Sequence, residues 1–127
     1  MMPLVTLTTC KPQSADTKSG VLDAIHAALV GVGVPVADRF QRVIELSPEN
    51  VRIDPGYPDV AGARGDNFLL IEILWSVGRS VNVKRTLLAD LMVRLAAAGI
   101  DNEQVMVVFK EVGWENWSFA GGRILHS

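Results

Sequence analysis

Two stretches of the same design decide the fold. The first, residues 14–33, reads SADTKSGVLDAIHAALVGVG, and the second, residues 80–99, reads SVNVKRTLLADLMVRLAAAG. Each opens on serine, a residue that caps the start of helices, and closes on glycine, a residue that ends them. Asp16 is an alternative cap in the first stretch. Apolar side chains between these ends recur at three- and four-residue spacing, so the pattern predicts amphipathic helices over about residues 16–32 and 81–97.

Predicted strands flank both helices. LVTLTTC and FQRVIEL surround the first helix, and FLLIEILW and QVMVVFKEV surround the second. Adding 66 to a residue number in the first half gives a matching residue in the second: Leu4 and Leu70, Ser14 and Ser80, Lys18 and Lys84, Leu22 and Leu88, Leu29 and Leu95, Gly33 and Gly99, Glu45 and Glu111. The sequence therefore predicts a single α+β domain over residues 1–127, built from tandem βαβ units at about residues 3–50 and 68–119. The units would share one four-stranded mixed sheet with both helices on one face.

The composition is that of an ordinary globular protein, with 49% hydrophobic and 20% charged residues in 127. The net charge of −2 argues against nucleic acid as a partner, and no apolar run approaches the ~20 residues that cross a bilayer. No secretory signal is recognised before the first strand. Cys10 is the single cysteine and lies far in the sequence from both histidines, which predicts a reducing, cytoplasmic setting and no metal site.

One face of the predicted sheet carries no helix. Alternate residues of LVTL, FLLIEILW and QVMVVF would lie on it, and we expect that face to be apolar. Such a face is commonly buried against further copies of the same chain. We therefore expect a homo-oligomer.

Four segments carry a resemblance to a known family: PLV at residues 3–5, VPVADRFQ at 34–41, GRSVNVK at 78–84 and ENWSFAGG at 115–122. In their order and spacing they resemble the tautomerase superfamily, in particular its double-βαβ branch with malonate semialdehyde decarboxylase and related amino-terminal-proline tautomerases. The resemblance implies a tautomerase/MIF-like fold, a homotrimer, no cofactor and a catalytic amino-terminal proline.

On this resemblance Pro3 is the acid–base residue and Arg79 holds the anion. A terminal secondary amine titrates somewhat above ~8, and an apolar pocket with a nearby cation lowers that pKa toward neutrality. The neutral amine can then take a proton from the carbon beside a carbonyl and return it elsewhere, which is tautomerisation. Arg79 lies in a turn before a helix start and offers a two-pronged guanidinium to an enolate or carboxylate.

We predict one further catalytic residue, Asp38, and five substrate-binding residues: Trp117, Phe119, Arg39, Arg64 and His26. The resemblance places Asp38 beside the proline, where it would orient water or substrate. The two aromatic residues would make the pocket wall apolar, although aromatic side chains also serve in cores and interfaces. A lone helical histidine and loop arginines also commonly have structural or solvent-facing roles.

Three functions remain open on the sequence. The leading one is a tautomerase of a small keto or enol acid such as a phenylenolpyruvate-like compound. The second is a lyase that decarboxylates or hydrates a small keto or unsaturated acid through Asp38, although residues 76–78 lack the second arginine of related decarboxylases. The third is a non-catalytic trimeric binding or scaffold protein, which would follow if both leading methionines stay attached and Pro3 is an ordinary amide. A chain started at Met2 would instead lose that methionine and expose Pro3.

Overall fold

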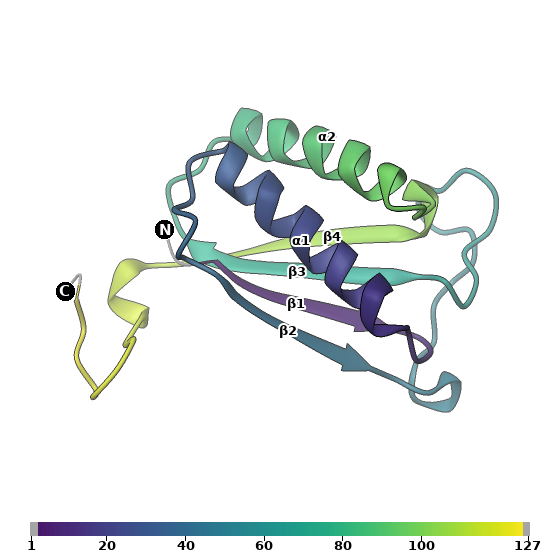
Figure 1. Ribbon diagram of the computed structural model, residues 1–127, viewed down its shortest axis with the longest axis horizontal. Helices are drawn as coiled ribbons and strands as arrows, with labels where there is room; N and C mark the ends of the chain where they lie inside the picture. Colours follow the sequence, from purple (N-terminus) through teal and green to yellow (C-terminus); the bar gives the residue numbers. More distant parts are fainter. Residues whose placement is uncertain (1–2, 126–127) are drawn as a thin grey trace.

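The computed structural model describes residues 3–125; the predictions on the two leading methionines lie outside that range. The elements are β1 (Leu4–Thr9), α1 (Ala15–Gly31), β2 (Phe40–Glu45), β3 (Leu69–Ser76), α2 (Val81–Ala97) and β4 (Val105–Val112), with 3₁₀ turns at Pro48–Asn50, Asn102–Gln104 and Trp114–Asn116. The strand order is β2-β1-β3-β4, with β1 parallel to β2, β3 parallel to β4, and the central pair antiparallel. Both helices cover the same side of the sheet (Figure 1). The predicted arrangement of two βαβ units is confirmed.

The helix ends follow the signals in the sequence. The hydroxyls of Ser14 and Ser80 each accept a hydrogen bond from the backbone N–H three residues on, at 3.1 and 3.2 Å, so Ser14 rather than Asp16 is the first cap. Gly33 and Gly99 have φ of 105° and 83°, a backbone conformation that costs glycine little and other residues more. The two helices therefore start and stop at positions that differ by 66.

The core lies between the helices and the covered face of the sheet. The buried residues of each helix include three at four-residue spacing, and the two sets differ by 66: Val21, Ile25 and Leu29, then Leu87, Leu91 and Leu95. The sheet contributes Val5, Leu7, Leu69, Ile71, Ile73 and Trp75. Burying each large apolar side chain contributes roughly 1.5–3 kcal/mol before entropy is subtracted, so this layer holds the strand ends in place. Among the described residues, no helix is both long and apolar enough to span a membrane.

The opposite face differs from the apolar surface that we expected. Strand alternation places Thr6 and Glu72 there, at paired positions of the two central strands. Arg42 donates from Nε to Thr6 Oγ1 at 2.8 Å, and Lys110 forms an ion pair with Glu72. The expectation was wrong for the middle of the face, because two of the apolar runs quoted for it place a polar residue there, Thr6 in the first and Glu72 in the second. A polar row runs over β2, β1 and β3 and ends at Val108 on β4. Apolar residues lie to either side: Leu4, Ile44, Leu70, Leu74 and Met106.

Candidate active site

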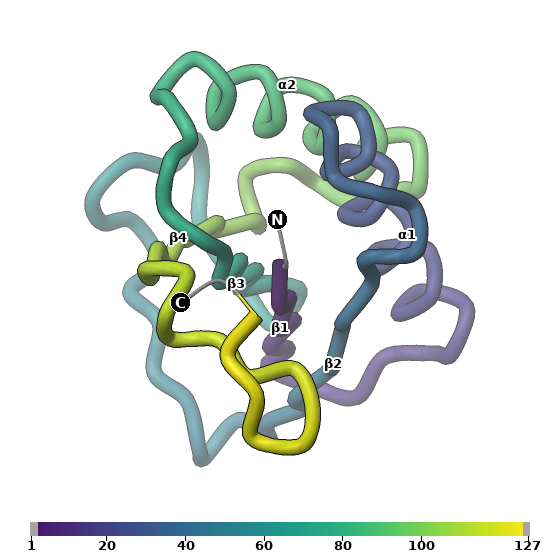
Figure 2. Tube along the Cα trace, turned by 90° about the vertical axis from the view of Figure 1, so that its left-hand side faces the viewer, coloured from purple at the N-terminus to yellow at the C-terminus, as the bar shows by residue number. Residues whose placement is uncertain are grey.

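The predicted catalytic proline lies where several chain segments end. Leu4 pairs with Phe40 on one side and with Leu74 on the other, so Pro3 stands at the starts of β1 and β2 and at the end of β3. The segment after β4 reaches the same end of the sheet (Figures 1 and 2). Together these segments enclose a cavity of about 200 Å³ lined by Pro3, Leu4, Phe40, Trp117, Ser118 and Phe119. The sequence identified three of these six residues.

The cavity wall is mainly aromatic and apolar. Pro3 is buried, and the rings of Trp117 and Phe119 lie 6.0 Å apart with an angle of 28° between their planes. Trp117 Nε1 is buried and has no hydrogen-bond partner within residues 3–125. An indole N–H can only donate, and leaving a buried donor unpaired is unfavourable. Trp117 contributes its ring to the cavity wall, while its N–H is covered by protein atoms.

Arg79 lies at the same end of the sheet, in the turn between β3 and α2. Its Nη1 donates to the Ser76 carbonyl and, at 3.0 Å, to the Ser76 hydroxyl. Its guanidinium carbon lies 4.5 Å from the centroid of the Trp75 ring. Burial lowers the pKa of Arg79, while the negative charges of Glu111 and Asp38 act in the opposite direction. The guanidinium stays charged near neutral pH, and the fold brings Arg79 and Asp38 within electrostatic reach of each other.

Two predicted arginines have their side chains elsewhere. Arg39 forms an ion pair with Asp23 of α1 at 2.6 Å and donates from Nε to Gln41 at 2.9 Å. Arg64 donates from Nη1 to two backbone carbonyls of its own connection, those of residues 54 and 57, at 3.0 and 2.5 Å. Neither side chain lines the Pro3 cavity, and Arg79 and Asp38 do not line it either.

His26 has a structural contact that bears on Asp38. The ring is buried on α1, and its Nε2 lies 2.9 Å from the backbone oxygen of Val36. A carbonyl can only accept, so Nε2 carries the proton in this bond. The contact ties the segment before Asp38 to the helix, two residues from the carboxylate.

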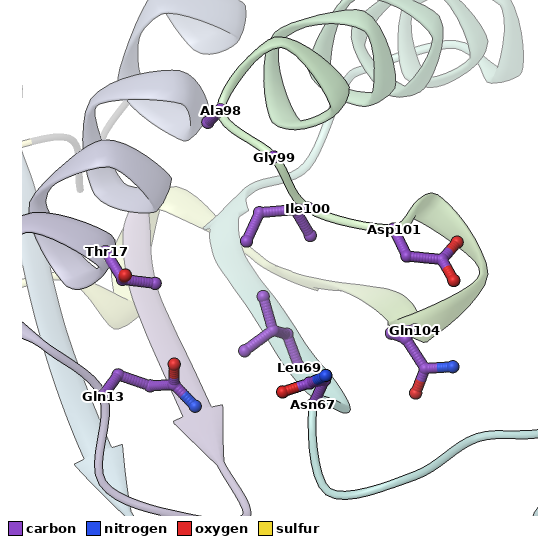
Figure 3. Close-up of a pocket in the computed structure, with 9 residues that line it drawn as sticks. All are labelled: Gln13, Thr17, Asn67, Leu69, Ala98, Gly99, Ile100, Asp101 and Gln104. Carbon is purple, nitrogen blue, oxygen red and sulfur yellow. The ribbon is translucent and has the colours of Figure 1, made fainter.

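A second, larger cavity of about 290 Å³ lies at the other end of the molecule (Figure 3). The repeat makes it the counterpart of the first site, because Leu69 corresponds to Pro3, Gln13 to Arg79 and Gln104 to Asp38. The Gln104 side chain is engaged in holding the connection before β3, accepting from Gly65 and donating to Ala63. None of the predicted catalytic residues lines this cavity. Within residues 3–125, no group of three or more His, Cys, Asp and Glu residues could hold a metal ion.

Sequence reasoning missed Phe40 as a wall residue and Trp75 as the ring beneath Arg79. Phe40 lies inside the segment VPVADRFQ, so its position next to Asp38 was an available signal. Trp75 precedes Arg79 by four residues, but it ends an apolar strand and therefore resembles an ordinary core residue.

Comparisons with known proteins agree with the fold. A family model described as "Tautomerase enzyme" matches residues 38–120. A structure of malonate semialdehyde decarboxylase, whose report concerns its decarboxylase and hydratase activities, matches with a TM-score of 0.84 and 27% identity over 95% of this chain and 93% of that one. FG41 malonate semialdehyde decarboxylase inhibited by 3-bromopropiolate matches with a TM-score of 0.85 and 24% identity, covering 95% and 92%. A fused 4-OT, described as a symmetric trimer, matches with a TM-score of 0.72 and 24% identity over 95% and 94%. No match was found among curated proteins.

Proposed function

Because this chain belongs to the tautomerase family, we propose that it is a cofactor-independent tautomerase of a small keto–enol acid with an apolar or aromatic body. The observation that carries this proposal is the apolar, aromatic cavity around Pro3 at the sheet end that also bears Arg79. An apolar wall fits the body of such an acid, and a guanidinium fits its carboxylate.

The proposed reaction needs three groups in addition to the apolar wall. In a chain that begins at Pro3, the neutral secondary amine removes a proton from the carbon next to the keto group and returns it to oxygen or carbon. Arg79 binds the carboxylate and fixes the acid in the cavity. Asp38, within electrostatic reach of Arg79, orients the guanidinium.

The test compares two chains, one beginning at Pro3 and one carrying Pro3→Ala in the same context. With a phenylenolpyruvate-like substrate, the alanine variant should be slower by at least about 100-fold, the lower end for a positioned acid–base group. Equal rates would refute the proline mechanism. Intact-mass measurement of protein expressed from its native start tells which terminus the cell produces. Retained methionines together with no turnover would favour the binding or scaffold alternative.

A second candidate function is a lyase acting on a small β-keto or unsaturated acid. Two observations favour it: the 27% identical relative whose report names decarboxylase and hydratase activities, and the proximity of Asp38 to Arg79. The segment Ser-Val-Gly at residues 76–78, without a second arginine, counts against it. Carbon dioxide release from malonate semialdehyde that is lost in Asp38→Asn would rank the lyase above the tautomerase, and no release at all would remove it.

A further inference from the structure

The chain contains its own reference for the surroundings of Arg79. The first βαβ unit has the same scaffold as the second but carries Gln13 at the matching position. The capping serine is the same in both units, and the ion pair between Lys18 and Glu45, at 2.9 Å, recurs between Lys84 and Glu111. Side chains that differ beside Arg79 are therefore not demanded by the scaffold.

Three side chains around Arg79 differ from their counterparts in the first unit. Trp75, Ser76 and Phe109 stand where the first unit has Thr9, Cys10 and Val43. Two of the three contact the guanidinium, one below its face and one at its edge. The third stacks on the tryptophan, with ring centroids 5.3 Å apart and planes inclined by 16°. The differences thus form one continuous set of contacts that ends at Arg79.

Filling the core does not by itself explain a tryptophan at this position. Trp75 is fully buried, and its Nε1 has no hydrogen-bond partner in the described part of the chain. Leucine or phenylalanine would fill core space without that unfavourable buried donor. What tryptophan adds is the ring face under the guanidinium. Leucine has no ring, and phenylalanine has a ring that attracts cations less strongly than indole does. A fully buried ring also cannot turn away, so it fixes the plane of the guanidinium that lies over it.

We infer that Trp75 is a positioning residue, whose indole face, backed by Phe109, orients Arg79 to bind a monocarboxylate beside the Pro3 cavity. This inference rests on the proposed role of Arg79 in anion binding. A planar guanidinium binds a carboxylate well only in the right orientation, so losing the ring weakens anion binding even though the charge remains. Arg79 is partly buried, so we expect an effect of about tenfold, between those of exposed and of desolvated cation–π contacts.

The test measures binding to the full chain by NMR titration, with phenylacetate as the anionic probe and phenylacetamide as its neutral counterpart. Trp75→Met removes the ring face and should weaken phenylacetate binding about tenfold, whereas Trp75→Phe keeps a ring and should stay within about threefold. Neither variant should change phenylacetamide binding. Ile73→Val, a trimmed core residue two positions earlier on the same strand, is the control for lost packing and should change neither probe. In an Arg79→Gln background, Trp75→Met should have no further effect, since the two residues then no longer share an interaction.

The outcomes separate this inference from the proposed function. If Arg79→Gln weakens phenylacetate binding but Trp75→Met does not, the positioning role of Trp75 is overturned and the anion contact stands. If Trp75→Met weakens both probes equally, Trp75 acts through packing alone and the inference fails. If Arg79→Gln has no effect, both the anion contact and its positioning residue are wrong. Should Trp75→Met not fold, Phe109→Leu removes the backing ring instead; about a threefold loss for phenylacetate alone supports the inference, and no loss overturns it.

Discussion

Three arginines are candidates for the anion contact, and the structure separates them by their partners. Arg79 contacts Ser76 and the Trp75 ring at the end of the sheet that holds Pro3. Arg39 points to Asp23 on α1, and its side chain is 40% exposed. Arg79→Gln and Arg39→Gln are therefore matched variants. Each removes one positive charge, the first at the proposed anion contact and the second away from it.

The expected difference follows from the bonds that each arginine would make to substrate. A guanidinium bound to a carboxylate in the two-pronged manner makes two charge-assisted hydrogen bonds, each contributing about 1.5–3 kcal/mol, whereas glutamine keeps one bond to the carboxylate. Arg79→Gln should therefore lose about 1.5–3 kcal/mol of transition-state binding, a factor of about 10–150 in kcat/KM. Arg39→Gln breaks an exposed ion pair whose contribution to stability is below about 1 kcal/mol, and kcat/KM should stay within about twofold.

The assay follows the ultraviolet absorbance of an aromatic enol acid as it converts to the keto form, with folding of both variants checked by circular dichroism. Most of the Arg79→Gln loss should be in KM, because the carboxylate is bound in both the ground state and the transition state. Equal losses in the two variants would mean that overall charge, not the Arg79 site, attracts the substrate. A larger loss for Arg39→Gln would place the anion contact on the α1 side and refute the present assignment.

Three further predictions concern the His26 contact near Asp38, the stability of the fold at acid pH, and the oligomeric state. His26→Phe removes the donor to the Val36 carbonyl, so it should lower the free energy of unfolding by about 1 kcal/mol in urea titrations and also reduce kcat. His26→Gln keeps a donor and should recover part of both losses. An unchanged kcat in His26→Phe would disprove the link between His26 and Asp38. Hydrogen bonds from the N–H groups of residues 56 and 57 lower the pKa of Asp54 in the folded chain. The Asp54 carboxylate therefore stabilises the fold above its unfolded pKa, and this contribution is lost as pH falls through the lower folded pKa. In Asp54→Asn, the free energy of unfolding should depend less on pH below about pH 4, and an unchanged slope would contradict this. Sedimentation equilibrium should give about three times the 13.8 kDa chain mass, the trimer that the resemblance in the sequence implies, and a stable monomer would exclude trimeric assembly.

The fold was predictable because its signals are local and occur twice. Serine caps, glycine stops and apolar spacing act within one helix, and they fixed both helices to within a residue or two. The polar row on the open face was visible in principle as well, because Thr6 and Glu72 lie at alternate positions of predicted strands. It was missed because the alternate residues of the three runs were expected to be apolar throughout, although Thr6 and Glu72 are among them.

The site was less predictable because it depends on which side chains come into contact, whereas the sequence indicates mainly where helices and strands begin and end. The sequence favoured Arg79 for the anion and kept Arg39 as a substrate-binding residue, but it did not indicate that Asp23 engages Arg39 or that the Trp75 ring lies under Arg79. Likewise, nothing local indicates that Phe40, at the start of an edge strand, meets Trp117 and Phe119 from the end of the chain. Such contacts join residues more than 70 positions apart and are decided by the packing of the whole sheet.

The repeat distinguishes what the fold requires from what the site requires. Positions where both units agree, such as the capping serines and the Lys–Glu pairs, maintain the βαβ scaffold at either end of the molecule. The units differ at most other positions, and around Arg79 these differences touch one another: Trp75, Ser76 and Phe109 stand where the first unit has Thr9, Cys10 and Val43. These contacts and the cavity beside Pro3 support the proposal that this end of the sheet is the functional end.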